Sequence, residues 1–204
     1  NGISKAVKRA FRLAIELESE LSDYQPTSDL SHVNRLAGTG KFYPIHEAFR
    51  SILMESIQAK KLSNGALNVF AGKQVRIWRN ARKNLVMPDL DALQQIAQKI
   101  QGNCLEFSAD STAVRLLDSA CQLDLGSLGK GFVAQRVLDE LKRMGFPYAL
   151  VDAGGKIVMT SQNPSDLPWQ VGIEMPISKT LLPETYSLKH VSVATSGKTY
   201  QSMQ

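Results

Sequence analysis

The sequence predicts an α+β fold in which helices pack on antiparallel or mixed sheets. Amphipathic helical patterns fill most of the first half of the chain, and short apolar segments bounded by turn residues dominate the second half. Because helices lead and strands follow, instead of alternating as βαβ units, the α+β class fits better than α/β. The 204 residues, 43% of them hydrophobic, are enough for a sizeable core.

The opening helix has the clearest pattern. Apolar residues recur at three- and four-residue steps over residues 3–21, opposite a face of charged side chains. Ser28 is placed to cap a second, short helix that Gly38 ends. Further helices are expected over residues 47–62, 73–78, 91–100 (capped by Asp89) and 132–144 (ended by Gly145).

The strands are expected to be short. They are predicted over residues 42–45, 104–107, 114–117, 121–125, 148–152, 155–160, 169–174 and 190–195. The three segments between residues 104 and 125 are interpreted as a meander. The pair Gly154-Gly155 is suited to a hairpin turn, which is a common use of such dipeptides.

A glycine-rich junction, LDLGSLGKGFVAQ over residues 123–135, is the strongest functional signal. It is interpreted as a strand, a turn with three glycines and the start of a helix, where main-chain amides and the helix dipole favour an anion. Lys130 adds a positive charge, and Asp124 and Ser127 add oxygens suited to a divalent metal. The segment is not a P-loop, because Asp124 stands where a glycine is needed and Gly131 where Ser or Thr is needed. A strand-to-helix junction without any ligand stays open as the alternative.

The net charge of +5 does not by itself indicate a nucleic-acid-binding protein. The basic residues form two clusters without interleaved aromatic residues: Lys5, Lys8, Arg9 and Arg12, and Arg76, Arg79, Arg82 and Lys83. Small anions suit this charge equally well, and solvated helix faces are the favoured interpretation of both clusters.

The two cysteines, Cys104 and Cys121, have no CxxC spacing, so we expect neither a disulfide framework nor a zinc site. No apolar stretch is long enough to span a membrane, and no signal peptide is recognised. Because the chain starts inside an amphipathic pattern, removal of a leader is left open. The scattered residues His32, His46 and His190 receive no catalytic role.

Four separated stretches together resemble the FAD:protein FMN transferases, the ApbE family. SDYQPTSDLSHVN over residues 22–34 is similar to the family's S-x-Y-x-x-x-S-x-x-S-x-x-N, and SNGALNVFAGKQVRIW over residues 63–78 is similar to its G-A-F-D-x-T-x-G segment with a following Trp. Residues 124–134 are similar to D-L-G-x-x-x-K-G-x-A. VDAGGKI at 151–157 followed by VATSG at 193–197 completes the family order.

The resemblance implies binding of FAD and a magnesium ion, cleavage of the FAD pyrophosphate, transfer of FMN to a Ser or Thr hydroxyl of an acceptor flavoprotein, and release of AMP. It also implies a periplasmic location at the outer face of the bacterial inner membrane, and membrane association as a lipoprotein through a leader outside this chain. Carried over by position, the residues expected to bind FAD are Tyr24, Ala66, Leu67, Asn68, Asp124 and Lys130. Asp124 and Lys130 are the expected catalytic residues, and Ser127 is the expected metal ligand.

The residue chemistry is compatible with these roles, and each residue also has a structural alternative. Lys130 can neutralise charge that develops on the leaving phosphate, and a flat Tyr24 ring suits an isoalloxazine. Alternatively, Tyr24 closes a turn, Asn68 ties its own loop, and Asp124 caps the turn that follows it. Trp78 is interpreted as a core residue.

The sequence also departs from the family pattern. Asn68 stands where the family usually has Asp, and Leu67 where it has Phe. The family's downstream H-x-x-D-P-x-T-G and D-x-x-[AS]-T segments, and the strand before its first helix, are not found. We therefore expect residues 1–204 to be a single ApbE-like domain that is incomplete at both ends. A flavin-binding protein without transferase activity is the main alternative, and a module that kept the fold but lost the ligand is a further one.

Overall fold

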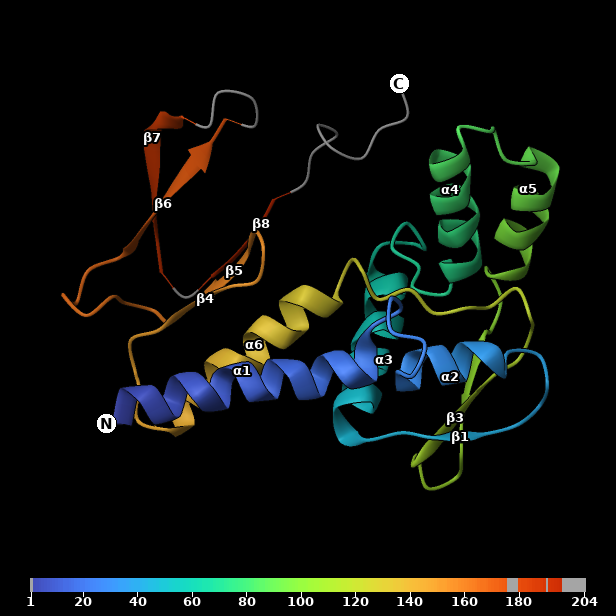
Figure 1. Cartoon of the computed structure of the whole chain (residues 1–204), viewed down its shortest axis with the longest axis horizontal. Coiled ribbons are helices and arrows are strands. Elements are labelled where there is room, and N and C mark those ends of the chain that lie inside the picture. Colours follow the sequence, from blue (N-terminus) through green and yellow to red (C-terminus); the bar gives the residue numbers. More distant parts are fainter. Residues whose placement is uncertain (1, 176–179, 190, 196–204) are drawn as a thin grey trace. The chain divides into compact units, whose positions relative to one another are not determined.

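The structure is a computed structural model that describes residues 2–175, 180–189 and 191–195. It divides into two compact units, residues 16–129 and residues 1–15 together with 130–204. Helices and antiparallel strands occur in both units, which confirms the α+β prediction (Figure 1). The expectation of a single domain over residues 1–204 stays a prediction.

The helices of the first unit follow the predicted order. They are the end of α1 (Gly2–Leu21), then α2 (Asp29–Arg35), α3 (Glu47–Leu62), α4 (Gly72–Asn84) and α5 (Leu90–Lys99). Side-chain caps explain two starts: the Ser28 hydroxyl accepts from the Ser31 amide, and the Asp89 carboxylate accepts from two amides of α5. Helix α4 is longer than predicted and ends where Leu85 adopts a left-handed conformation with φ of 53°.

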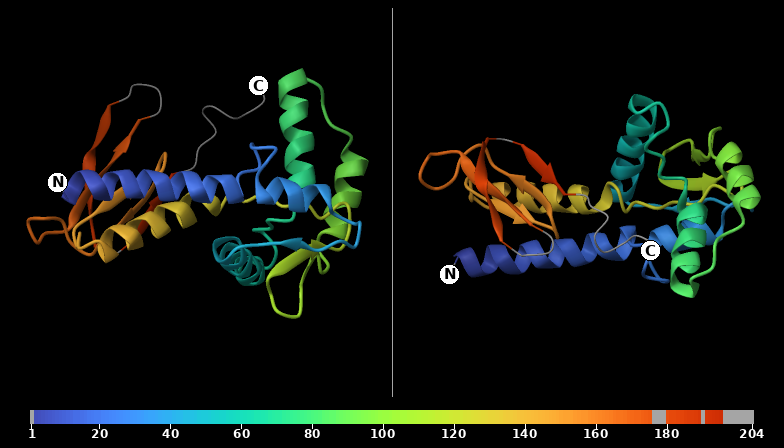
Figure 2. Two further views of the ribbon diagram at one scale, coloured as in Figure 1. Left: turned by 60° about the horizontal axis from the view of Figure 1, so that its bottom comes forward. Right: turned by 90° about the horizontal axis from the view of Figure 1, so that it is seen from above.

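A small antiparallel sheet and α3 supply the core of this unit. Strands β1 (Tyr43–Pro44), β3 (Ala113–Leu116) and β2 (Leu105–Phe107) lie in the order β1-β3-β2, with Tyr43 opposite Val114 and Leu105 opposite Leu116. The largest fully buried side chains include Phe49, Ile52 and Leu53 of α3. Helices α4 and α5 stand side by side, joined by a hydrogen bond from Gln74 Nε2 to the Leu93 carbonyl (Figures 1 and 2).

Two predictions about the strands and the cysteines of this unit are wrong. Residues 121–125 do not form a strand of the sheet, and Gln122 makes only an isolated parallel bridge with Ala71. Cys104 and Cys121, expected to be unpaired, form a disulfide with a Cα–Cα distance of 5.5 Å. The fold brings the start of β2 next to Cys121, and a separation of 17 residues gave no sign of this in the sequence.

The second unit combines two helices with two small sheets. Helix α6 (Gly129–Arg143) lies beside the first part of α1 (Figure 2). Strands β4 (Leu150–Asp152), β5 (Lys156–Met159) and β8 (Ser192–Ala194) form one antiparallel sheet, and β6 (Trp169–Glu174) pairs with β7 (Leu181–Leu188) in another. Ala134, Leu138 and Val158 form the core between α6 and β5.

Hydrogen bonds to Glu140 join α6 to α1 in this unit. Glu140 accepts from Arg143 at 2.8 and 2.9 Å and from Arg9 of α1 at 3.0 Å, and these bonds lower the pKa of Glu140 to about 2.

Gly154 and Gly155, with φ of 65° and 78°, make the β4–β5 turn, as predicted. Strand β7 was not predicted, and Pro183 in that run is a residue that normally argues against a strand. Of the strand predicted over residues 190–195, His190 lies outside the described residues.

Over the part of the chain that the structure describes, no helix is long and apolar enough to cross a membrane.

Candidate functional site

The candidate site is built around the main chain that leads to Asp124. Residues 122–124 run beside residues 69–72: the Asp124 amide donates to the Val69 carbonyl at 2.8 Å, and the Gly72 amide donates to the Gln122 carbonyl at 2.7 Å. A Cβ on Gly72 would lie 2.6 Å from the carbonyl oxygens of both Gln122 and Leu123. Only glycine therefore permits this close approach at the start of α4.

Asn34 of α2 fixes the same segment from another direction. Its Nδ2 donates to the Leu123 carbonyl at 2.9 Å, and its Oδ1 accepts from the Leu123 amide at 2.6 Å. The carboxamide thus satisfies both polar groups of Leu123, as a neighbouring strand would. Asn34 is 6% exposed and Leu123 is 1% exposed, so these bonds are shielded from water. They set the position of the next residue, Asp124.

The Asp124 carboxylate has a defined orientation. Its Oδ1 accepts from the Gly126 amide at 2.8 Å, and its Oδ2 accepts from Arg79 Nη2 at 2.9 Å. The first bond caps the turn before α6, which was the structural alternative for this residue. The second bond draws a charged side chain of α4 into the site, so that the Asp124 side chain is only 12% exposed.

Arg79 connects Asp124 to the loop that follows α1. Its Nη1 donates to Asp23 Oδ2, and its guanidinium carbon lies 4.7 Å from the centroid of the Tyr24 ring. Burial acts to lower the pKa of Arg79, but the hydrogen bond and charge of Asp23 and the charge of Asp124 outweigh it and raise the pKa. Arg79 was expected on a solvated helix face, and this is wrong: its side chain is 27% exposed and pairs with two carboxylates.

The loop that carries Asp23 and Tyr24 is held by serine side chains. The Ser28 hydroxyl donates to the Ser22 carbonyl at 2.5 Å, the Ser31 hydroxyl donates to the Gln25 carbonyl at 2.8 Å, and the Ser22 hydroxyl accepts from the Tyr24 amide at 3.2 Å. Tyr24 is nevertheless 77% exposed. The loop therefore offers one large aromatic side chain to solvent on a fixed main chain.

The segment Ala66 to Asn68 lies directly before the pairing at Val69. Asn68 ties its own loop: its Oδ1 accepts from the Phe70 amide at 3.1 Å, and its Nδ2 donates to the Ile100 carbonyl at 3.2 Å. The Leu67 amide donates to the Ser63 hydroxyl at 3.0 Å, and Ala66 is exposed. The structural alternative for Asn68 is thus observed, which does not test whether Asn68 also contacts a ligand.

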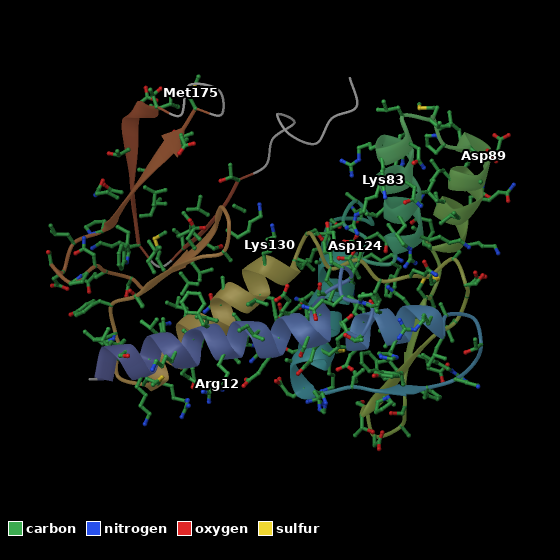
Figure 3. The ribbon with its side chains drawn as sticks, in the orientation of Figure 1. Arg12, Lys83, Asp89, Asp124, Lys130 and Met175 are labelled. Carbon is green, nitrogen blue, oxygen red and sulfur yellow. A yellow bond between two sulfur atoms is a disulfide. The ribbon has the colours of Figure 1, made fainter. Side chains whose placement is uncertain are left out.

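Ser127 and Lys130 are both exposed. Ser127 lies in the turn after Asp124, and its hydroxyl has no hydrogen-bond partner among the described residues. Lys130 belongs to the other unit and projects from the first turn of α6 (Figure 3). Within residues 16–129, the structure therefore brings Tyr24 and Asp124 together through Arg79, with Ser127 three residues along the chain from Asp124.

These side chains could supply only part of the ligand set of a magnesium ion. In the ranges 2–175, 180–189 and 191–195, no group of three or more His, Cys, Asp or Glu side chains could hold a metal. The free Ser127 hydroxyl could supply one oxygen, while both Asp124 oxygens already accept hydrogen bonds. Magnesium commonly takes only one or two protein oxygens and completes its shell with phosphates and water, so this small set is compatible with it.

The site contains three residues that were not predicted from the sequence: Asn34, Arg79 and Asp23. Asn34 did carry a signal, because it occupies an apolar-periodic position of a short helix, where a polar side chain needs a buried partner. Arg79 directly follows Trp78 in the second family-like stretch but was grouped with its basic neighbours on α4. Trp78 itself, interpreted as core, is 37% exposed, so that interpretation is wrong.

The fold and the site define an α+β protein with a carboxylate–arginine cluster at a glycine-rich turn. Residues 3–204 match the model of the ApbE family, and the chain belongs to that family. The solved structure of the flavin transferase ApbE from Vibrio cholerae is similar with a TM-score of 0.81 and 25% identity, over 98% of this chain and 65% of that one. The apo flavinyl transferase ApbE of Pseudomonas stutzeri shares the fold, with a TM-score of 0.80 and 23% identity, over 96% of this chain and 61% of that one.

Relatives named FAD:protein FMN transferase are also similar to most of this chain over part of their own length. The protein of Treponema pallidum is 28% identical over 96% of this chain and 58% of its own length. The Vibrio cholerae protein is 28% identical over 91% of this chain and 56% of its own length. The chain thus spans somewhat more than half the length of these curated relatives.

Proposed function

We propose that this protein is an FAD:protein FMN transferase. The observation that carries the proposal is the ApbE family match over residues 3–204, supported by relatives of that name. The site adds chemical support: an exposed aromatic ring, a fixed carboxylate and an exposed hydroxyl gather within residues 16–129.

In the proposed reaction, a Ser or Thr hydroxyl oxygen of an acceptor flavoprotein attacks the FMN-side phosphorus of FAD. A new P–O bond forms, the P–O bond to the AMP phosphate breaks, and AMP leaves with the electron pair of that bond. The hydroxyl proton is released to the leaving phosphate or to water. Products are the FMN-modified acceptor and AMP, so that atoms and charges balance.

The proposed roles follow the chemistry of each side chain. Tyr24 would lie against the flavin, and Ala66, Leu67 and Asn68 would line the FAD pocket. Asp124 and Lys130 would contact FAD, Lys130 by neutralising charge on the leaving phosphate. Ser127 would hold magnesium, which supplies Lewis-acid polarisation of the phosphates when bound.

A periplasmic location is part of the proposal. The Cys104–Cys121 disulfide supports it, because disulfides persist in oxidising compartments such as the bacterial periplasm and are rare in the cytosol. A fractionation of cells with an antibody to this chain tests it, and recovery only in the cytosolic fraction would argue against it.

The direct test combines the full gene product with FAD, magnesium and an acceptor flavoprotein domain. Mass spectrometry should show the acceptor gaining the mass of one FMN, and AMP should appear in equal amount. Lys130→Ala should weaken FAD binding by about 1.5–3 kcal/mol through loss of a charge-assisted contact. Absence of any added mass at saturating FAD would refute the transferase assignment.

A flavin-binding protein without transfer is the second candidate. One observation favours it: both amide atoms of Asn68 bond within their own unit, to Phe70 and Ile100, where the family usually has an Asp. This candidate predicts FAD binding by isothermal titration with no dependence on magnesium. A strong dependence on magnesium would favour the transferase.

A further inference from the structure

Arg79 contacts Asp124 and Tyr24, two side chains that the proposed function assigns to FAD binding. It donates to the Asp124 carboxylate at 2.9 Å and lies over the Tyr24 ring at 4.7 Å, and a further bond runs to Asp23. We propose that Arg79 is a positioning residue for FAD binding, which holds Tyr24 and Asp124 in place and cancels one of the two carboxylate charges beside them. This inference rests on the proposed function.

The geometry requires the forked shape of arginine. One terminal nitrogen, Nη1, serves Asp23 on the loop after α1, and the other, Nη2, serves Asp124. Because the planar guanidinium presents its donors in fixed directions, it can bridge two carboxylates while its face covers an aromatic ring. A lysine ammonium at the same position could pair with one carboxylate but would lose this simultaneous set of contacts.

The charge balance gives the arrangement a consequence for an anionic substrate. Asp23 and Asp124 both lie against a single guanidinium, and their side chains are 17% and 12% exposed. With Arg79 present the three groups carry a net charge of −1, and without it they carry −2 in a partly shielded place. The FAD pyrophosphate is negatively charged, so that removal of Arg79 would oppose its approach.

Tyr24 gains a fixed orientation from the same residue. The stacked guanidinium covers part of one ring face, and Tyr24 still exposes 77% of its surface. An aromatic ring held in this way loses less conformational freedom when a flat ligand binds it. Both effects act on the binding of FAD more than on the chemical step.

Steady-state kinetics of FMN transfer test the inference, with FAD titration by calorimetry as the second measurement. Arg79→Met should raise the KM for FAD by about tenfold to hundredfold, in line with loss of charge-assisted hydrogen bonds, while kcat stays within about threefold. Arg79→Lys should restore part of the affinity. The matched control is Arg76→Met, which alters an exposed arginine of the same helix and should leave KM and kcat unchanged.

The charge argument has its own variant. Adding Asp23→Asn to Arg79→Met removes the unpaired carboxylate and should recover at least about threefold of the lost FAD affinity. If Arg79 instead touches FAD itself, no recovery follows and the positioning role is overturned. Should Arg79→Met fail to fold, the same comparison is made in the Arg79→Lys background.

The possible failures are distinguishable. A kcat that falls at unchanged KM would mean that Arg79→Met reduces the folded fraction or slows the chemical step without weakening FAD binding, and this overturns the inference. A variant equal to an active wild type overturns the inference and leaves the transferase assignment standing. A wild type that neither binds FAD nor transfers FMN overturns both.

Discussion

Asn34 provides the most direct test of how the site is held. Asn34→Ala removes both hydrogen bonds to Leu123 and leaves the Leu123 amide and carbonyl without partners in a buried place. Each buried polar group left unsatisfied costs about 1–3 kcal/mol, which predicts a total loss of about 2–6 kcal/mol. Because whole domains are stable by only about 5–15 kcal/mol, this single change should shift the unfolding transition strongly.

The assay is urea unfolding followed by circular dichroism, with the free energy obtained by linear extrapolation. Asn80→Ala is the control, since Asn80 is exposed on α4, and it should change stability by less than about 0.5 kcal/mol. Asn34→Asp is a sharper variant: it keeps an acceptor for the Leu123 amide but sets a carboxylate oxygen against the Leu123 carbonyl. It should be at least as destabilising as the alanine variant.

The reasoning would be refuted if Asn34→Ala cost less than about 1 kcal/mol, because buried peptide groups would then have found other partners at little expense. It would also be refuted if the aspartate variant were as stable as the wild type.

Three further changes test other parts of the fold. Replacing Cys104 and Cys121 by serine should destabilise the protein by about 3 kcal/mol, seen as a lower Tm that reducing agent no longer affects, whereas reducing agent should lower the wild-type Tm. Gly72→Ala should cost about 1–3 kcal/mol in the same assay, because its Cβ would meet two main-chain carbonyls at 2.6 Å, whereas Gly102→Ala, with its nearest contact at 3.8 Å, should be tolerated. Glu140→Gln should lower the stability of the protein above pH 5. Because folding depresses the pKa of Glu140 from 4.5 to about 2, the difference in stability from the wild type should fade as the pH falls through that range. A difference that does not depend on pH would contradict the ion-pair explanation.

Sequence periodicity was sufficient for the helices and most strands. Helix α3 has the bounds that were predicted, and Ser28 and Asp89 cap α2 and α5 as expected, because these signals are local. The prediction of a strand over residues 121–125 was wrong for the opposite reason, because the contacts of this segment are not local. Its alternating apolar residues are buried as in a strand, but its partners are the Asn34 side chain and residues 69–72, which lie far away in the sequence.

The candidate site residues show the same contrast between local sequence signals and long-range contacts. Tyr24, Asp124 and Ser127 could be named because they lie in stretches with a recognisable pattern. Arg79 could not be chosen from its basic neighbours, since only the fold shows that it meets both Asp23 and Asp124. The disulfide is a comparable case, because the pairing of two distant cysteines depends on the three-dimensional path of the chain.

The spacing of the first family-like stretch now has a physical explanation. Ser22, Ser28 and Ser31 bond to the main chain of their own loop, and Asn34 bonds to the residue before Asp124. Four of its five patterned residues therefore act as scaffold, and the fifth, Tyr24, is exposed. If this division is right, Tyr24 substitutions should change FAD affinity with little effect on Tm. Ser28→Ala, at a buried serine, should instead lower Tm while the folded fraction retains its KM for FAD.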